Sequence, residues 1–440
     1  MPDPSSLPFL WGTATASYQI EGAVSEGGRT ASIWDTFAHT LHKIERSETG
    51  DIACDHYHRY KEDVALMQEL GVKAYRFSIS WNRILPEGKG KPNPRGVDFY
   101  NRLIDALLGA EITPFVTLFH WDLPQTFQDR GGFTNRDIAG WFSEYAAQTA
   151  TLFGDRVKHW IMLNEPSVFA YLGHALGVHA PGLADLKAFF ATTHHLNLAQ
   201  GTAVKGLRSI DGSFQLGTTL NVHLAVAADD SEESALMAQK HDDLWNDSFL
   251  GPLLTGKYPD RVLPDIEPFI QPGDLEVARQ KIDFLGINHY FRTHIKANPK
   301  AILGYEQVAP PAELPRTSFE WEINPGHFRD LLLSLHTRYP CPPIIITENG
   351  AYFDDTLSDD GRVHDTKRIE FLDGYIHAML QARESGVDIR GYFVWSTLDN
   401  FEWASGYRPT FGIVRVDFDT LKRTRKDSFY WYKDFIKDHP

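Results

Sequence analysis

The chain alternates between short apolar runs and longer amphipathic stretches. Eight runs rich in β-branched and aromatic residues recur, and each ends in polar or aromatic side chains. They cover residues 9–16, 73–78, 114–119, 159–163, 215–220, 284–287, 344–347 and 392–395. Between them, apolar residues recur at helical spacing within residues 58–70, 99–110, 138–154 and 366–386, mostly with a glycine at the C-terminal end. The pattern predicts strands that alternate with helices.

This alternation predicts a parallel sheet, because each strand is joined to the next by a helical crossover. Nearly continuous apolar runs such as residues 342–347 are typical of strands buried on both faces. Eight such units favour an α/β fold: a single (β/α)₈ TIM barrel with enlarged βα loops, forming one catalytic domain over residues 1–440. The alternative is a doubly wound open sheet, which would need a glycine-rich phosphate loop after the first strand. Residues 9–23 contain no such loop.

Composition limits the partners that the protein is expected to have. The formal charge is −15, and the acidic residues are spread along the chain, so we expect no nucleic acid and no membrane surface as partner. The two cysteines, Cys54 and Cys341, match no zinc or redox spacing. The sequence has no apolar leader and no run of 18 apolar residues, which favours a cytoplasmic protein. The 11 tryptophans are many beside 5 methionines and 2 cysteines.

Side chains that can catalyse a reaction or bind a ligand follow the predicted strands, which is where the active site of a barrel lies. In chain order they are Gln19, Arg76, His120 with Trp121, Asn164 with Glu165, Asn288 with Tyr290, Glu348, and Trp395 followed by Glu402 and Trp403. The fifth strand, which ends near Asn221 and His223, gives the weakest indication. In a closed barrel all of these positions converge on one mouth.

Two carboxylates stand out, because Glu165 and Glu348 each follow a buried apolar run, where an ionisable group is costly unless it is paired or used. Each has a simpler explanation. The Asn349-Gly350 pair is typical of a hairpin turn, and Glu165 precedes a proline that ends the strand. Both explanations weaken when the two acids face one pocket. Such a pair suits glycoside hydrolysis, with one general acid and one nucleophile or base.

The other strand-end residues fit a sugar. Gln19, His120, Asn164 and Glu402 offer hydrogen-bond donors and acceptors for hydroxyl groups. Trp121, Trp395 and Trp403 offer flat apolar faces for the C–H groups of a pyranose ring, and Trp321 lies in a long loop at the same mouth. Trp141 and Trp160, by contrast, fall in helical or strand patterns and are expected in the core.

Other chemistries find less support. The chain has no H-E-x-x-H motif, phosphate-binding P-loop or G-x-S-x-G motif, so we expect no metal and no cofactor. His56, His58, His194 and His195 are expected on helix surfaces rather than as ligands, and His120 could be a core histidine. Two further readings stay open: a barrel that binds carbohydrate without turnover, and a metal-dependent sugar isomerase, which would need a carboxylate-rich cage.

Seven segments resemble the signature blocks of glycoside hydrolase family 1, the retaining β-glucosidases. They are FLWGTATASYQIEGA, RFSISWNRILPEG, HWDLP, GDRVKHWIMLNEP, GINHY, ITENG and DNFEWASGY, in the family's order and over almost the whole chain. The resemblance implies a β-glucosidase that takes small β-glycosides or oligosaccharides, as in the degradation of cellulose and other polysaccharides, by double displacement and with possible transglycosylation. Glucose, galactose and fucose stay open as the sugar, and so does the oligomeric state.

The resemblance also implies residue roles. Glu165 would be the acid/base, and Glu348 the nucleophile, supported by Arg76 and Tyr290. Sugar contacts are implied for Gln19, His120, Asn164, Glu402 and Trp403, with Trp395 as the platform beneath the sugar and Trp321 on the aglycone side. Trp121, Asn288, Tyr290 and Phe411 are also expected to bind the substrate. The chain departs from the family pattern at Met162-Leu163, which is expected to change packing, and at Glu320 and Thr410, which bear on aglycone preference. The intact Glu165 and the acidic Glu402 favour ordinary O-glycosides of a neutral, unphosphorylated sugar.

Overall fold

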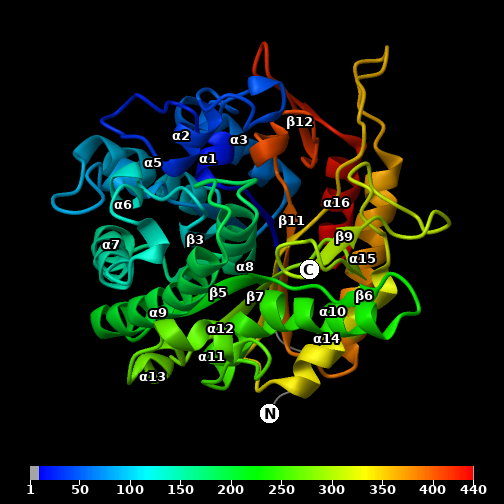
Figure 1. Ribbon diagram of the computed structural model, residues 1–440. Coiled ribbons are helices and arrows are strands. Elements are labelled where there is room, and N and C mark those ends of the chain that lie inside the picture. Colours follow the sequence, from blue (N-terminus) through cyan, green and yellow to red (C-terminus); the bar gives the residue numbers. More distant parts are fainter. Residues whose placement is uncertain (1–8, 440) are drawn as a thin grey trace.

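A computed structural model describes residues 9–439, and its centre is a closed barrel of eight parallel strands (Figure 1). The strands pair in the order β1-β2-β3-β4-β5-β7-β10-β11, and β11 pairs back with β1. They are β1 (Leu10–Ala14), β2 (Ala74–Ser78), β3 (Thr113–Phe119), β4 (His159–Asn164), β5 (Gln215–Asn221), β7 (Phe284–Asn288), β10 (Ile344–Asn349) and β11 (Ile389–Trp395). Each predicted run overlaps one of these strands, so the prediction of a (β/α)₈ barrel rather than an open sheet is confirmed.

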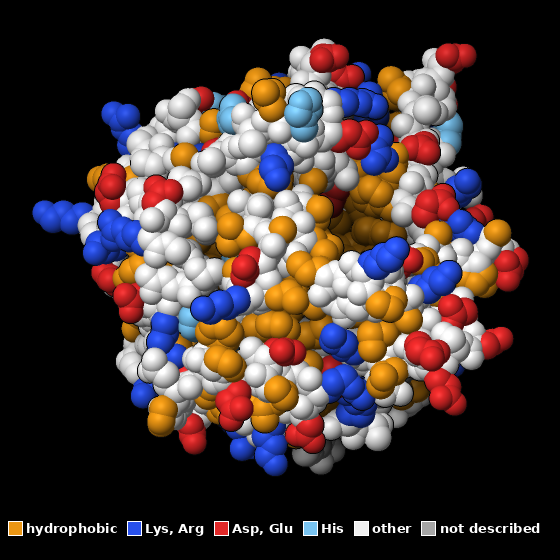
Figure 2. All heavy atoms as spheres, viewed as in Figure 1, with side chains coloured by type: hydrophobic (Ala, Val, Ile, Leu, Met, Phe, Trp, Pro, Cys, Tyr) orange, Lys and Arg blue, Asp and Glu red, His pale blue; other side chains and the backbone are white. Residues whose placement is uncertain are grey.

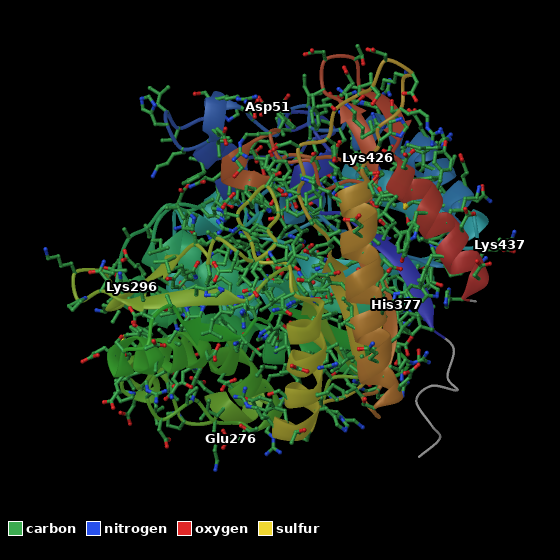
Figure 3. All side chains as sticks on the ribbon, turned by 90° about the vertical axis from the view of Figure 1, so that its right-hand side faces the viewer. Asp51, Glu276, Lys296, His377, Lys426 and Lys437 are labelled. Carbon is green, nitrogen blue, oxygen red and sulfur yellow. The ribbon has the colours of Figure 1, made fainter. Side chains whose placement is uncertain are left out.

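Helices form the outer layer, since each apolar face needs a sheet to cover. The long ones are α3 (His56–Leu70), α5 (Pro94–Gly109), α7 (Ile138–Phe153), α9 (Leu186–Ile210), α14 (Pro325–Arg338), α15 (Thr366–Glu384) and α16 (Asp427–Asp438). In Figure 3, α15 (orange) lies beside α16 (red), and the rings of His377 and Phe435 contact each other between them. The helices predicted from residue spacing are all present, with ends that shift by a few residues.

Short helices and extra strands enlarge the connections after the barrel strands. The helices are α1 (Ser17–Ile20), α2 (Ile33–Ala38), α4 (Trp81–Ile84), α6 (Gln125–Gln128), α8 (Pro166–Ala170), α10 (Glu232–Asp242), α11 (Ser248–Leu254), α12 (Leu263–Ile266) and α13 (Asp274–Ala278), with a π-helical turn η4 (Tyr171–Ala175) after α8. A three-stranded sheet joins β6 (Ala225–Ala227), β8 (Thr293–Ala297) and β9 (Tyr305–Val308), and β12 (Val414–Asp417) forms a hairpin with β13 (Lys422–Arg425). These enlarged connections were predicted, and they supply walls for the cavity described below.

Side chains from alternate strand positions fill the inside of the barrel. Ala74, Phe115, Ile161, Phe284, Ile345 and Phe393 form one buried cluster there. Two glycines make room for its rings. A Cβ on Gly12 would lie 2.6 Å from the Phe393 ring, and a Cβ on Gly217 would lie 2.4 Å from the Phe284 ring. The barrel is therefore a packed core, and a ligand has space only at its end.

The prediction that four histidines lie on helix surfaces is right only for His58. His56 is buried and bonds through Nδ1 to Asp63 at 2.7 Å, while His194 bonds through Nε2 to Asp274 at 2.9 Å. His195 is also buried, with Nδ1 2.9 Å from the Phe133 carbonyl oxygen. The physical reason is that these helices have more than one buried face: α9 packs against both α7 and α13, and α3 packs against both α5 and α16. None of the helices within residues 9–439 is long and apolar enough to cross a membrane.

Candidate active site

A cavity of about 310 Å³ lies at the C-terminal ends of the barrel strands. The surface in Figure 2 is hollowed, with hydrophobic side chains inside the hollow. Ten of the predicted site residues line the cavity: His120, Trp121, Glu165, Tyr290, Trp321, Glu348, Trp395, Glu402, Trp403 and Phe411. The other four, Gln19, Arg76, Asn164 and Asn288, lie behind this lining and bond to it. The predicted set is thus brought together in two layers.

Glu348 lies in β10 itself, so the alternative that residues 347–350 form a hairpin turn is wrong. Its side chain is only 3% exposed, and Oε1 accepts a hydrogen bond from the Arg76 guanidinium while Oε2 accepts one from the Tyr290 hydroxyl at 2.5 Å. Burial raises the pKa of Glu348, and the charge of Arg76 with the Tyr290 hydrogen bond opposes that rise. Arg76 and Tyr290 thereby stabilise the ionised carboxylate in a dry site.

Glu165 follows the last residue of β4, where the backbone turns with a positive φ of 45° and Pro166 begins α8. Its Oε1 accepts hydrogen bonds from Asn288 Nδ2 at 2.8 Å and Asn221 Nδ2 at 2.9 Å. Burial first, and then the charge of Glu348, raise the pKa of Glu165 to about 8. The carboxyl group is therefore protonated at neutral pH. Because Oε1 already receives two N–H groups, the proton resides on Oε2.

The same carboxyl type thus occurs in two protonation states within one cavity. A pair whose pKa values are pushed apart in this way is the arrangement that acid and base chemistry requires. Positive φ values also occur at Trp121 (77°) and Trp403 (51°), which line the same cavity. Backbone of this kind costs about 1–3 kcal/mol per residue and concentrates at functional sites.

A polar wall of the cavity has unused hydrogen-bonding capacity. Arg76 donates to Asn164 Oδ1, so the Asn164 amide nitrogen faces His120 Nε2 at 2.9 Å, and this ring nitrogen accepts. Burial and the charge of Arg76 hold the pKa of His120 well below its ordinary value, so the neutral ring carries its proton on Nδ1. His120 Nδ1 and Gln19 Oε1 are both buried without a protein partner. A donor and an acceptor are free for hydroxyl groups, and His120 is more than a core histidine.

Aromatic rings form the remaining walls. Trp395, Trp403 and Trp121 are each 4% exposed; the His120 ring stacks on Trp395 and Trp403, and the centroids of Trp121 and Trp403 lie 4.6 Å apart. A second group, Phe291, Phe319, Trp321 and Phe411, lies on another wall, with Phe291 and Trp321 stacked at 4.6 Å. Trp160, in contrast, is fully buried in the outer core, as predicted. Trp141 is partly buried and packs against the same core.

Sequence reasoning missed several lining residues. They are Val168, Leu172, His179, Asn221, His223, Trp245, Phe291, Gln307, Phe319 and Ser405. Asn221 and His223 follow the strand with the weakest indication in the sequence, although Asn221 contacts Glu165 directly. Their position at the end of β5 was the available signal. Most of the others lie in the enlarged connections, where no periodicity marks the side that faces the cavity.

The departures from the family pattern have local effects. Met162 and Leu163 are fully buried in the outer core, so the change there affects packing, as expected. Glu320 points outward, with 64% of its side chain exposed, and pairs with Arg316 at 2.6 Å. Thr410 donates to the Phe353 carbonyl oxygen at 2.7 Å. Within residues 9–439, no group of three or more His, Cys, Asp or Glu residues is arranged to hold a metal ion.

A closed (β/α)₈ barrel with two buried carboxyl groups in one aromatic-walled cavity at the ends of its strands has the arrangement of a barrel glycosidase. Residues 4–440 match the model of Glycosyl hydrolase family 1, and the chain belongs to that family. It is 48% identical over 436 residues to Beta-glucosidase A of Thermotoga maritima, covering 98% of this chain and 97% of the relative. It is 47% identical over 435 residues to the 1,4-beta-D-glucan glucohydrolase of Thermotoga neapolitana, covering 98% of both chains.

Solved structures agree with these relatives. The family 1 β-glucosidase of Thermotoga maritima superposes with a TM-score of 0.94 at 47% identity, covering 98% of this chain and 97% of that one. The same enzyme in complex with glucoimidazole gives 0.93 at 48% identity, covering 98% of both chains. A more distant relative, 41% identical over 455 residues and covering 98% of both chains, is a bifunctional β-D-glucosidase/β-D-fucosidase of Bifidobacterium breve.

Proposed function

We propose that this protein is a β-glucosidase that removes β-D-glucosyl residues from the non-reducing end of small glycosides and oligosaccharides, with retention of configuration. The observation that carries the proposal is the pair of carboxyl groups at the ends of β4 and β10, which line one cavity: Glu348 accepts from Arg76 and Tyr290, and Glu165 accepts from two neutral amides. The β-glucosidases among the relatives support glucose as the sugar. We also propose that the whole chain is one catalytic domain, because the barrel takes strands from Leu10 to Trp395.

In the first step, the ionised Glu348 attacks the anomeric carbon, while Glu165 donates its proton to the leaving oxygen. Arg76 and Tyr290 hold both oxygens of Glu348, so the carboxylate is oriented before the substrate arrives. The C–O bond to the aglycone breaks as the bond to Glu348 forms. The products of this step are a glucosyl ester on Glu348, an ionised Glu165 and the free alcohol.

In the second step, Glu165 acts as the base. Burial and the charge of Glu348 keep the pKa of Glu165 at about 8 in the free enzyme. The ester carries no charge, so one of these two causes disappears and the pKa of Glu165 falls. The ionised Glu165 then takes a proton from water, which attacks the anomeric carbon and releases glucose with retained configuration. Glu165 regains its proton, and the cycle is complete.

The sugar subsite follows from the free polar atoms and the rings. His120 Nδ1 offers a proton and Gln19 Oε1 a lone pair to hydroxyl groups of the sugar. Glu402 lines the cavity beside them, where Gln19 Nε2 lies 3.4 Å from its Oε2. Trp395 forms the apolar platform, with Trp403 and Trp121 beside it. The group containing Trp321 and Phe411 accepts the aglycone, since it lies apart from the polar wall.

Release of nitrophenol from p-nitrophenyl β-D-glucoside tests the reaction. We expect wild-type protein to be active and Glu348→Ala to lose roughly 10⁴-fold or more in kcat, because the nucleophile is gone. Azide fits the space left by the side chain and should restore turnover, giving the α-glucosyl azide. The exposed Glu384→Ala serves as the control and should behave as wild type. Activity that survives in Glu348→Ala contradicts the assignment, and complete inactivity of wild type favours a binding protein.

Selectivity for the sugar is tested by comparing kcat/KM for the p-nitrophenyl β-D-glucoside, β-D-galactoside and β-D-fucoside. We expect the glucoside to be preferred and the fucoside to be accepted, as the name of the Bifidobacterium breve relative suggests. A 6-phosphoglucoside should be rejected, because its dianion would enter a cavity that holds the carboxylate of Glu348 and has no Lys or Arg in its lining.

A further inference from the structure

A chain of buried polar side chains runs from Glu165 away from the cavity. After Asn221 it passes through His223 at the end of β5, His241 in α10, and Tyr305 in β9. His223 Nδ1 lies 3.3 Å from Asn221 Oδ1, the two Nε2 atoms of His223 and His241 lie 3.0 Å apart, and His241 Nδ1 lies 3.1 Å from the Tyr305 hydroxyl. The two imidazoles and Tyr305 are at most 3% exposed.

The Trp245 indole fixes which way the Asn221 amide points. Its N–H group only donates, and it lies 3.3 Å from Asn221 Oδ1 and 3.1 Å from the Asn221 carbonyl oxygen. Oδ1 is therefore the acceptor end of the amide, and Nδ2 is the end that faces Glu165 Oε1. His223 must then be the hydrogen-bond donor to Oδ1. Its Nδ1 carries the hydrogen, since two lone pairs would otherwise face each other.

The remaining bonds follow from this one. Burial, with the neighbouring His241 and His289, holds the pKa of His223 well below its ordinary value, and burial lowers the pKa of His241 to about 3, so both rings are neutral. A neutral His223 that donates through Nδ1 must accept at Nε2 from His241. His241 then accepts at Nδ1 from the Tyr305 hydroxyl. In each hydrogen bond of the chain the donor lies on the Tyr305 side and the acceptor on the Glu165 side. Each of the donor hydrogens takes part in one hydrogen bond.

We propose that His223, held by His241 and Tyr305, is a positioning residue for the acid/base: it keeps the Asn221 amide in the orientation that donates to Glu165 Oε1. This inference rests on the proposed function of Glu165. A reversed amide would place an oxygen against Glu165, which disfavours the ionised carboxylate that the second step needs. The chain thus acts on the base step more than on the first proton transfer.

Several other groups also influence the pKa of Glu165, and they limit how far that pKa can change when His223 is lost. Glu348, Arg76, Glu402 and Tyr290 interact with it electrostatically, and Asn288 supplies the other hydrogen bond to Oε1. Trp245 keeps one hydrogen bond to Asn221 Oδ1 when His223 is absent. Loss of His223 should therefore shift the pKa of Glu165 upward by about one unit rather than remove its function.

The test compares His223→Phe, which has no ring nitrogens, with His223→Asn, whose amide nitrogen can replace Nδ1 as the donor. In His223→Phe we expect the alkaline limb of kcat/KM to move up by about one pH unit. We also expect kcat for p-nitrophenyl β-D-glucoside to fall roughly 10-fold, because the good leaving group makes the first step fast and leaves the base step rate-limiting. In His223→Asn most of both changes should be reversed. Tyr305→Phe, which removes one oxygen, should give a smaller shift in the same direction and serves if His223→Phe does not fold.

Controls separate positioning from packing and from substrate contact. His174 is equally buried and bonds only to the Phe169 carbonyl oxygen, so His174→Phe should lower Tm without moving the alkaline limb. Because His223 lines the cavity, cellobiose is measured alongside the aryl glucoside. A shift of the limb that is equal for both substrates supports positioning, whereas a change in KM for only one aglycone overturns it in favour of a direct contact.

One further variant distinguishes the two proposals. Glu165→Gln should abolish the alkaline limb, and if the limb persists the proposed role of Glu165 fails. If Glu165→Gln removes the limb but His223→Phe has the profile of wild type and only a lower Tm, the inference about His223 is wrong while the acid/base assignment stands.

Discussion

At the scale of single residues, Glu165 and Glu348 show how hydrogen-bond partners divide the work between identical groups. Glu348 accepts from a guanidinium and a phenol, which favours its charge. Glu165 accepts from two neutral amides, which only partly oppose the rise in its pKa, and burial with the charge of Glu348 favours its proton. The difference arises from side chains on β2, β5 and β7 and from Tyr290, two residues past β7, not from the acids themselves. Changing a partner should therefore also change the chemistry, although by less than removing an acid.

Tyr290→Phe tests this view, because it removes the donor to Glu348 Oε2 and leaves the ring. A hydrogen bond to a charged group contributes about 1.5–3 kcal/mol, so kcat/KM should fall roughly 10- to 100-fold. The lost bond opposed the rise in the pKa of Glu348, so that pKa increases, and the acidic limb of the rate profile should move to higher pH. The exposed Tyr430→Phe is the matched control. An unchanged acidic limb in Tyr290→Phe would show that its hydroxyl does not act on the nucleophile.

At the scale of elements, buried ion pairs connect segments that are distant in the chain. Asp63 in α3 is fully buried, accepts from Arg423 of β13 at 2.9 Å and contacts His56 Nδ1 at 2.7 Å. Burial raises the pKa of Asp63, but the hydrogen bonds and charges of His56 and Arg423 outweigh it and leave the pKa below its ordinary value. The cluster therefore stabilises the protein above about pH 4, and the stabilisation is lost as the pH falls further.

Asp63→Asn should be strongly destabilising, since it leaves Arg423 buried without its charged partner. We expect the free energy of unfolding to fall by about 3–5 kcal/mol, with kcat of the folded protein unchanged. Urea denaturation followed by tryptophan fluorescence gives the difference. Glu62→Gln alters the neighbouring residue, whose exposed carboxylate contacts Arg59, and should change stability by less than about 1 kcal/mol. Equal effects of the two substitutions would contradict the argument.

At the scale of the whole molecule, the active site lowers the stability of the fold. The pKa of Glu165 is about 8 in the folded protein, well above the ordinary value of 4.5. Between these pH values the folded state binds a proton that the unfolded chain has released, so unfolding becomes easier as the pH rises. The site therefore costs stability in the pH range where its acid is protonated and functional.

Glu165→Gln should remove this cost together with the activity. We expect its Tm to exceed that of wild type by roughly 2–4 °C at pH 8, and the difference to shrink at pH 5, which is close to the ordinary pKa of 4.5, so that the unfolded chain keeps part of its proton. Differential scanning calorimetry at the two pH values measures it. Glu276, labelled at the lower edge of Figure 3, is exposed, and Glu276→Gln should leave Tm unchanged at both. A difference that does not grow with pH would refute the linkage.

The barrel and most of the cavity could be predicted because strands leave a strong signal. An apolar run such as residues 344–347 is readable in isolation, and parallel pairing then brings its end to a common mouth. The contribution of β5 was underestimated, because Asn221 and His223 acquire meaning only through contacts with Glu165 and His241. The burial of His194 was missed for a similar reason: the helix pattern does not show that a second helix covers the other face.

Closure of the barrel has a consequence for how the chain is made. β1 begins at Leu10 and its last partner, β11, ends at Trp395, so the two open edges of the sheet disappear only when nearly all of the chain has left the ribosome. At about 5–20 residues per second, roughly 20–80 s pass between the two strands. During that time unpaired strand edges are open to other nascent chains. A barrel that has no sheet edge when finished therefore carries two open edges for most of its synthesis.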